Sequence, residues 1–319
     1  MALIAENFIS SPHCYSEAIE KLRAKLVTLA SSIAPRTGVY ITSIDGFKIA
    51  RSICPTEITP SFYKPSASFF IQGAKTIKIN KSTYACNSPS CLIVSASLPA
   101  LSRIVSASSD APYISLHIDL DINEMLSICS AWPKQNQLYQ VPRSAVGFED
   151  INEKMYDALF RLICTLENPR DMKALAPLLL REITFRLLQG SHGFQLREIA
   201  RHNSQLQRIN HAITSLVNNY NAPLNPEYLA NLTGISLRAF NHRFQMITGM
   251  SPLDFQNQLR LHQARQLIIF GGVDVFTASR FTGYDSHLIF TQEYTRLFDS
   301  SPFSDERLYK AADVLVGED

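Results

Sequence analysis

The sequence of 319 residues lacks the features that mark secreted, fibrous or strongly basic proteins. Charged residues make up only 18% of it, and 30 Lys and Arg stand against 28 Asp and Glu, giving a formal net charge of +2. This balance excludes a polybasic protein and by itself gives no sign of a nucleic-acid partner. Hydrophobic residues reach 46%, which is typical of globular proteins, and the length suits two domains of ordinary size.

Long apolar runs are also missing. No stretch approaches the roughly 18 consecutive apolar residues of a transmembrane helix, so we expect no membrane association. No Lys or Arg precedes the apolar residues at the start of the chain, which reads MALIAENFIS, so we expect no secretory signal. The predicted location is the cytoplasm.

The six cysteines predict neither a disulfide scaffold nor a metal site. They contain no Cys-x-x-Cys pair, and their spacing matches no zinc motif. Reduced and mostly buried thiols are the expected state. A redox-sensing pair at Cys86 and Cys91 is the alternative, although no neighbouring residue marks a thiol of low pKa. The cysteines are Cys14, Cys54, Cys86, Cys91, Cys129 and Cys164.

Residues 38–120 have the alternating pattern of short β-strands. Residues 38–44, 91–96 and 113–119 are predicted strands, with turn residues between them. Residues 69–73 and 75–80 are predicted to form a hairpin with Gly73 in its turn. Several short strands at this spacing predict a small barrel or sandwich.

From about residue 149 the apolar residues recur at helical spacing. One stripe runs from Ile151 to Leu166 and stops at Asn168-Pro169, and a second runs from Leu175 to Leu187 and ends at Gly190. A third begins at Leu206. The polar, glycine-containing segment between the second and third stripes is the best candidate for a linker.

Residues 225–249 predict two short helices across a tight turn. Asn225-Pro226 begins the first helix, Gly234 supplies the turn, and Ser236 caps the second helix. This is the arrangement of a helix-turn-helix motif. An ordinary helical hairpin in a protein core would look similar, so one match is weak evidence.

The motif recurs, which makes the signal specific. Residues 274–299 repeat the pattern, with Gly283 in the turn and Ser286 as the cap, 50 positions after Ser236. A helix predicted over residues 252–270 joins the two copies and spans about 28 Å, comparable to one turn of B-DNA. Two recognition helices held in this way suit successive major grooves.

The sequence resembles the AraC family of bacterial transcription regulators over nearly its whole length. The C-terminal likeness rests on Gly234-Ile235-Ser236, Phe240, Phe244, residues 248–252, Leu259-Arg260-Leu261, Ala264-Arg265, residues 283–286, Phe290, Tyr294, Leu297-Phe298 and Pro302. The N-terminal likeness rests on residues 70–73, 175–183, 186–190 and Gly193.

The resemblance implies an α+β fold, in which a cupin-like β-barrel with helices precedes an all-α domain with two helix-turn-helix motifs. The expected boundaries are 1–190 for the effector-sensing and dimerisation domain, 191–204 for a linker and 205–312 for the DNA-binding domain. It also implies a sequence-specific regulator, expected to be an activator, that binds double-stranded promoter DNA as a homodimer, responds to a small-molecule effector and contacts RNA polymerase. We expect no enzymatic activity and no cofactor.

The residues expected to meet DNA lie on the two recognition helices. They are Ser236, Arg238, Asn241, His242, Arg243, Gln245, Ser286, His287, Leu288, Thr291 and Gln292. Relatives commonly carry basic residues at the positions of Gln245 and Gln292, so phosphate attraction should be weaker here. We expect the first helix to read most of the sequence and the apolar second helix mainly to position the domain. Arg260 and Arg265, on the connecting helix, should make internal salt bridges and not DNA contacts.

The effector is expected inside the barrel, which is large enough to hold one small ligand. Candidate lining residues are Tyr63, Phe69, Phe70, Tyr113 and His117, although core packing explains the aromatic ones as well. Only His117, beside Asp119, offers a histidine in the strand region, so no metal is expected.

Two alternatives stay open. The apolar second recognition helix favours a regulator that binds DNA only together with a partner. A cupin-type enzyme is the other, but the sequence contains no nucleotide-binding, nucleophile-elbow or zinc-protease motif.

Overall fold

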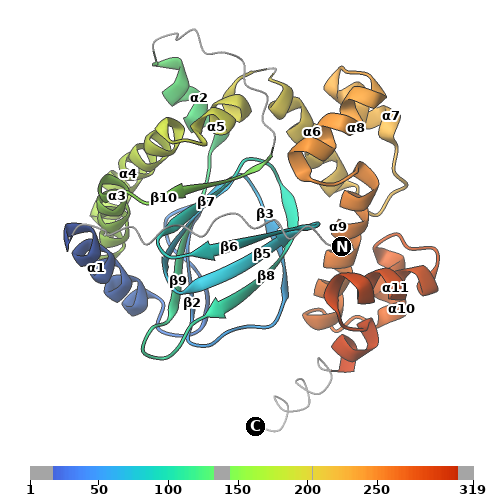
Figure 1. Cartoon of the computed structure of the whole chain (residues 1–319), viewed down its shortest axis with the longest axis horizontal. Helices are drawn as coiled ribbons and strands as arrows, with labels where there is room; N and C mark the ends of the chain where they lie inside the picture. The colour runs from blue at the N-terminus through green and yellow to red at the C-terminus, as the bar shows by residue number, and fades with distance from the viewer. Residues whose placement is uncertain (1–16, 133–143, 203, 308–319) are drawn as a thin grey trace, which may run out of the picture.

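The computed structural model of the chain describes residues 17–132, 144–202 and 204–307 (Figure 1). Cys14 and residues 308–312 of the predicted DNA-binding domain lie outside this part. The N-terminal elements are α1 (Glu17–Ile33), β1 (Gly38–Ile41), β2 (Phe47–Ser52), β3 (Thr59–Tyr63), β4 (Ser66–Gln72), β5 (Ala74–Ile79), β6 (Ser82–Asn87), β7 (Ser90–Val94), β8 (Leu98–Ser106), β9 (Tyr113–Asp119), α2 (Ile122–Ser130) and β10 (Val146–Asp150). The helical elements that follow are α3 (Glu153–Cys164), η1 (Thr165–Glu167), α4 (Pro169–Gln189), α5 (Gly193–Ala200), α6 (Gln205–Asn218), α7 (Pro226–Thr233), α8 (Leu237–Thr248), α9 (Pro252–Ile269), α10 (Val275–Phe281) and α11 (His287–Phe298).

The strands form two antiparallel sheets that lie face to face. The larger sheet has the order β1-β2-β9-β4-β7-β10, and the smaller has the order β3-β8-β5-β6. The predicted α+β fold is confirmed, but the strands form an open, cupin-like sandwich in place of a closed barrel. Two sheets with one apolar face each can bury those faces against each other or against helices without closing.

The predicted hairpin around Gly73 is wrong. β4 pairs with β7 and β9 in the larger sheet, whereas β5 pairs with β6 and β8 in the smaller one. Gly73 lies at the point where the chain passes between sheets and has a φ of +77°. An added Cβ would lie 2.9 Å from Cα of Tyr113, so glycine is required by conformation and by space. Sequence alternation predicted the strands but not which strands pair.

Helices cover the outer face of the larger sheet (Figure 1). α1 packs against β4 and β9, and α3 packs between α1 and α4. Residues 193–200, within the segment expected to be a linker, form α5, whose Leu196 and Ile199 are fully buried. Because α5 packs against α2, α4 and α6, the two halves of the chain are joined by packed helices at this point. Within the described residues, no helix is both long and apolar enough to cross a bilayer.

The C-terminal domain lies beside the smaller sheet (Figure 1). Leu101 of β8 is buried with Leu261 and Ala264 of α9 in one apolar cluster. Three hydrogen bonds join the domains near α6 and α8: Asn80 Nδ2 donates to the Gly249 carbonyl (2.6 Å), Ala145 N to the Ile247 carbonyl (2.9 Å) and Asn210 Nδ2 to the Ser95 carbonyl (3.1 Å). The two domains therefore form one packed body.

Candidate nucleic-acid interface and effector pocket

The first helix-turn-helix motif forms as the sequence predicts. The Asn225 side chain accepts a hydrogen bond from Tyr228 N (2.9 Å) at the start of α7, and Gly234 ends this helix with a φ of +66°. The Ser236 hydroxyl then caps α8 by accepting from Ala239 N. Phe240 and Phe244 are fully buried, so α8 is held by its aromatic face.

The second motif has the same construction. The Asp274 side chain caps α10 by accepting from Thr277 N (2.9 Å), and the Ser286 hydroxyl caps α11 by accepting from Ile289 N. Phe290 and Tyr294 are fully buried at the positions that correspond to Phe240 and Phe244. α8 and α11 each contain 12 residues and follow their serine caps directly. The two recognition helices therefore correspond position by position.

Arg260 of α9 fixes one motif against the other. Its guanidinium donates to the carbonyl oxygens of Tyr220 (2.7 Å) and Ala222 (2.9 Å) in the loop that leads from α6 into the first motif, and it lies 5.9 Å from the ring centre of Tyr284 in the second motif. Gly283, with a φ of +86°, is packed so closely that an added Cβ would collide with the Asn221 carbonyl oxygen. The relative orientation of the two motifs is therefore set by direct contacts as well as by α9.

Arg265 has a purely internal role, as predicted. Its Nε lies 2.9 Å from Oδ2 of Asp305, and both side chains are largely buried. The Tyr294 hydroxyl donates to the same carboxylate oxygen (2.7 Å). This network ties α9 and α11 to the segment that contains Asp305, so Arg265 belongs to the framework that positions α11. Arg260, for which an internal salt bridge was predicted, donates instead to the carbonyl oxygens of Tyr220, Asn221 and Ala222.

The exposed face of α8 is polar. Arg238, Asn241, His242 and Gln245 are all exposed, whereas Arg243 is half-buried. These four side chains can all form hydrogen bonds, and they begin at the second residue of the helix, the end that enters the major groove in helix-turn-helix proteins. Their arrangement suits the edges of bases and the adjoining phosphates.

The exposed face of α11 differs from that of α8. Leu288 is 68% exposed and Gln292 is exposed, but His287 and Thr291 are withdrawn from the surface. The His287 ring stacks on Phe276 with centres 4.1 Å apart, and the Thr291 hydroxyl donates to the His287 carbonyl (3.0 Å). Of the second helix's predicted contact residues, Leu288 and Gln292 project furthest.

Two exposed arginines near α11 escaped the sequence reasoning. Arg280 is on α10 and Arg296 is on the third turn of α11. The signal was available, because both fall within the repeated motif and neither is at a core position. They add exposed positive charge to the second motif, one on α10 and one in the last turn of α11.

Four of the candidate effector residues lie on the larger sheet, and Tyr63 lies on β3 of the smaller sheet. Tyr63, Phe70, Tyr113 and His117 face the space between the sheets, where the ring centres of Phe70 and Tyr113 are 6.5 Å apart. Burial raises the pKa values of the Tyr63 and Tyr113 hydroxyls far above the usual range, and nearby Cys86, on β6 of the smaller sheet, adds to both shifts. Phe69 alternates with Phe70 and therefore points toward the helices, away from this space.

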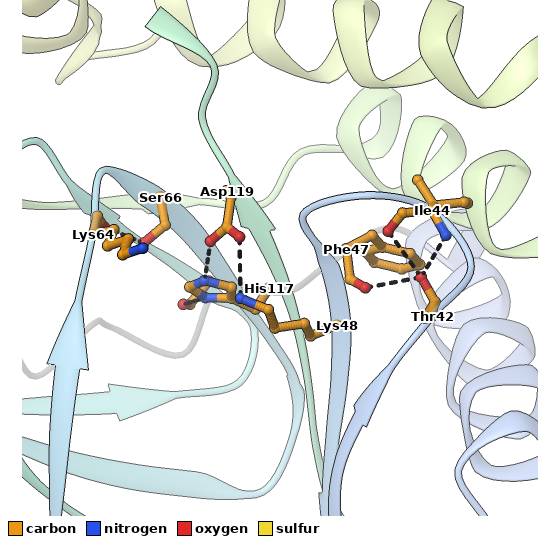
Figure 2. A network of polar contacts seen from close by, with 9 residues as sticks. Thr42, Ile44, Phe47, Lys48, Lys64, Ser66, His117 and Asp119 are labelled. Carbon is orange, nitrogen blue, oxygen red and sulfur yellow. Dashed lines mark hydrogen bonds and ion pairs between the residues drawn. The ribbon is translucent and has the colours of Figure 1, made fainter.

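His117 belongs to a polar network at one end of the sandwich (Figure 2). Its Nδ1 lies 2.9 Å from the Ser68 hydroxyl, and its Nε2 lies 3.0 Å from the Asp119 carboxylate, which also binds Lys48 Nζ at 3.1 Å. The hydrogen bond from His117, together with the one from Lys48, lowers the pKa of Asp119 to about 2. Ser68 is only 7% exposed, so this serine, histidine and aspartate do not present an accessible nucleophile.

Among the described cysteines, Cys86 and Cys91 are buried, Cys129 and Cys164 are half-buried and Cys54 is exposed, so the expectation of mostly buried thiols holds for two of the five. Cys86 faces the space between the sheets, whereas Cys91 pairs with Phe69 on the larger sheet. Burial raises the pKa of Cys86 to about 12 and raises that of Cys91 well above the usual range, so both are protonated at neutral pH. Among the described residues, no three His, Cys, Asp or Glu side chains gather as metal ligands.

The fold and the site define a class of protein, a helix-turn-helix protein with an attached β-sandwich domain. A family model described as the AraC-type transcriptional regulator N-terminus matches residues 43–195, and one described as a helix-turn-helix domain matches residues 229–304. The chain belongs to the AraC family of transcription regulators.

Curated relatives include three named activators. The chain is 27% identical over 153 residues to the transcriptional activator RhaS of Citrobacter koseri, covering 48% of this chain and 54% of that protein. It is 28% identical over 93 residues to the lactose operon transcription activator of Staphylococcus xylosus, covering 29% and 33%. It is 33% identical over 79 residues to the virulence regulon activator VirF of Yersinia enterocolitica, covering 25% and 29%. The chain thus spans about half the length or less of these relatives.

Solved structures of ToxT from Vibrio cholerae share the fold. An apo variant has a TM-score of 0.54 at 8% identity, covering 83% of this chain and 98% of that one. Wild-type ToxT with a bound unsaturated fatty acid has a TM-score of 0.52 at 9% identity, covering 81% and 94%. The likeness extends over both domains.

Proposed function

We propose that the protein is a sequence-specific DNA-binding regulator of transcription. The observation that carries this proposal is the pair of matching recognition helices, fixed relative to each other by α9, Arg260 and Gly283. α9 has 18 residues and is about 27 Å long, so the helices can enter neighbouring major grooves on one face of a duplex. Membership of the AraC family and the named activators among the relatives support the proposal.

The residues that we assign to the DNA interface lie on both helices. Arg238, Asn241, His242 and Gln245 read base edges from α8, and Arg243 lies beside the backbone. On α11, Leu288 and Gln292 face the groove, whereas His287 and Thr291 shape the helix from within. The hydroxyls of Ser236 and Ser286 cap the helices, and the first-turn backbone N–H groups that the caps leave free can donate to phosphates.

Selection of bound sequences from random double-stranded DNA by the full chain tests this function. Enrichment of one sequence, with footprint protection at matching promoters, is the expected outcome. The salt dependence should be shallow, with a slope of log K against log salt of about −3, because few exposed arginines flank the recognition helices. Recovery of random sequence after repeated rounds would overturn the proposal.

We also propose that a small-molecule effector binds between the two sheets, beside Tyr63, Phe70, Tyr113 and His117. These side chains combine aromatic surface with hydroxyl and imidazole groups, which is the usual composition of a ligand pocket. The fatty acid bound to ToxT supports effector control in a protein of this fold. Thermal unfolding of the chain with candidate ligands should show a rise in Tm for the effector, and Tyr113→Ala should abolish the rise. A ligand that raises the Tm of the natural chain and that of Tyr113→Ala equally would bind elsewhere.

A partner-dependent regulator is the second candidate, and the apolar tip of α11 favours it. The variant Gln292→Arg restores a cation at a position where relatives commonly carry one. If the natural chain binds DNA only weakly and this variant alone binds tightly, the second candidate is correct. Equal affinity of the two proteins for the selected sequence contradicts it.

Other partners are proposed from family membership. A second copy of the chain would bind the other half of a two-part promoter site, and Leu175 and Leu178, exposed on α4 beside a groove of about 360 Å³, are the first surface to test. RNA polymerase is the proposed target of activation. Because bacterial promoters lie in the cytoplasm, we place the protein there, with a non-enzymatic role.

A further inference from the structure

The two recognition helices carry opposite chemistry at equivalent positions. Ser236 and Ser286 cap them, and the second residue of each helix projects from the end that meets DNA. In α8 this residue is Arg238, whereas in α11 it is Leu288, which is 68% exposed. The next residue of α11, Ile289, is 51% exposed, whereas its counterpart Ala239 is half-buried. α11 thus presents a branched apolar tip where α8 presents hydrogen-bonding groups.

The apolar tip is held in a defined position by the structure around it. The His287 ring stacks on Phe276 and lies 5.8 Å from Phe303 in an edge-on arrangement. The Ser286 hydroxyl fixes the first turn through Ile289 N. A tip that is ordered before binding loses little conformational entropy when it is covered.

The surroundings of the tip favour DNA over an apolar protein partner. Arg280 of α10 and Arg296 in the last turn of α11 are exposed, and Gln292 is exposed one turn along α11. Exposed positive charge on both helices of this motif suits the phosphate backbones that border a major groove. Exposed Asp285 lies next to the cap and reduces that attraction, so contact by the tip itself must supply more of the affinity.

Only one group on the base edges in the major groove of unmodified DNA is apolar, the 5-methyl group of thymine. Leucine and isoleucine can pack against this methyl, whereas covering the polar edge of a G·C pair with them would leave its donors and acceptors unpaired. We propose that α11 reads thymine methyl groups through Leu288 and Ile289. The operator then has two unlike parts, a hydrogen-bonded part under α8 and a thymine-containing part under α11. This inference rests on the proposed DNA-binding function.

Replacing thymine by deoxyuridine tests the proposal, because this change removes the methyl group and leaves every hydrogen-bonding group in place. The full chain is used with the sequence enriched from random DNA, and Kd is measured by fluorescence anisotropy. Each deoxyuridine under α11 should raise Kd about fourfold, as expected for one methyl group returned to water. Deoxyuridine in the flanking sequence should leave Kd unchanged.

Variants of the chain link the effect to the tip. Leu288→Ala should bind more weakly and lose its response to deoxyuridine, and Leu288→Met, which keeps the apolar volume, should retain the response. Leu126→Ala, at an exposed leucine of α2 in the other domain, is the matched control and should behave as the natural chain. Circular dichroism confirms that each variant is folded.

The possible failures are distinguishable. If a sequence is enriched but deoxyuridine under α11 has no effect, or Leu288→Ala responds like the natural chain, the thymine proposal is wrong and the DNA-binding function stands. Loss of RNA polymerase binding in Leu288→Ala, with Kd for DNA unchanged, would likewise overturn the proposal in favour of a protein contact. If no sequence is enriched, the proposed function fails and this inference fails with it.

Discussion

Individual side chains on α8 carry the sharpest expectations about sequence preference. Asn241 is exposed near the middle of the recognition helix, and an asparagine can form two hydrogen bonds with adenine. Asn241→Ala should cost about 1–3 kcal/mol at one base pair of the selected site and flatten the preference there. Kd values for the four base pairs at each position measure this. Asn87→Ala, at an exposed asparagine of β6, is the control, and an unchanged preference profile in Asn241→Ala would remove the residue from direct readout.

His262 of α9 makes the stability of the C-terminal domain depend on pH. Its ring is 4% exposed against Phe298, and burial, with neighbouring Arg265, lowers its pKa to about 3. Between pH 6.5 and pH 3 the unfolded chain therefore binds a proton at this histidine and the folded chain does not. Above pH 6.5 the ring is neutral in both the folded and the unfolded chain. The free energy of unfolding then falls as the pH drops from 6.5 toward 3, because only the unfolded chain takes up the proton.

The free energy of unfolding should fall by about 1.4 kcal/mol per pH unit on account of His262 as the pH goes from 6.5 toward 3. Urea unfolding at a series of pH values gives this slope, and His262→Phe should reduce it. His211→Phe, at an exposed histidine of α6, is the control and should leave the slope as in the natural chain. Identical slopes for the natural chain and His262→Phe would show that the buried ring is not the proton acceptor.

At the scale of elements, the sequence predicted individual helices and strands better than their partners. α7, α8, α10 and α11 were predictable because caps, turn glycines and aromatic spacing are local signals. β4 and β5 were predicted as strands but were paired wrongly, because Gly73 suits a hairpin turn and a crossing between sheets equally well. α5 was mistaken for a linker, because its burial depends on packing against α2, α4 and α6, which the polar sequence of this short segment does not reveal.

The candidate site shows the same division. The exposed residues of α8 followed from helical periodicity within one element. Phe69 was grouped with Phe70 because adjacent aromatic residues look alike until the two faces of the sheet are known. The withdrawal of His287 depends on Phe276 and Phe303, which come from other segments, so the sequence of α11 alone could not predict it.

The junction between the two motifs gives a test at the level of elements. Gly283→Ala should lower the free energy of unfolding by more than the 1–3 kcal/mol expected for a strained backbone alone, because the new Cβ also collides with the Asn221 carbonyl. Gly249→Ala is a matched control, since Gly249 has a φ of +73° but nothing within 4 Å of an added Cβ. Urea unfolding of both variants measures the difference. Equal losses of unfolding free energy in the two variants would mean that the contact between Gly283 and the Asn221 carbonyl can shift to admit the added Cβ.

For the whole molecule, the fixed distance between α8 and α11 predicts a fixed spacing in the operator. Inserting five base pairs between the two parts of the selected site turns one part to the opposite face of the duplex. The affinity should then fall at least about tenfold, because base contacts worth about 1–3 kcal/mol each are lost. Inserting ten base pairs restores the facing but lengthens the span, so it should not restore the affinity. Recovery with ten base pairs would show that the motifs move independently.

The low net charge has a meaning at this scale that composition alone did not give. In the proposed mode of binding, a few arginines at fixed places align the domain on a duplex, and contacts with the bases supply the rest of the affinity. Non-specific binding should accordingly be weak, and the ratio of specific to non-specific affinity correspondingly sensitive to the fit of both helices.

The helix that joins the two motifs, α9, packs against β8 around Leu101. Because α9, Arg260 and Gly283 hold the two motifs in a fixed relative position, a displacement of β8 should tilt both recognition helices together. Control exerted through this contact would therefore alter how the protein engages the two parts of its operator at once, and leave the base preference of each helix as its own side chains set it.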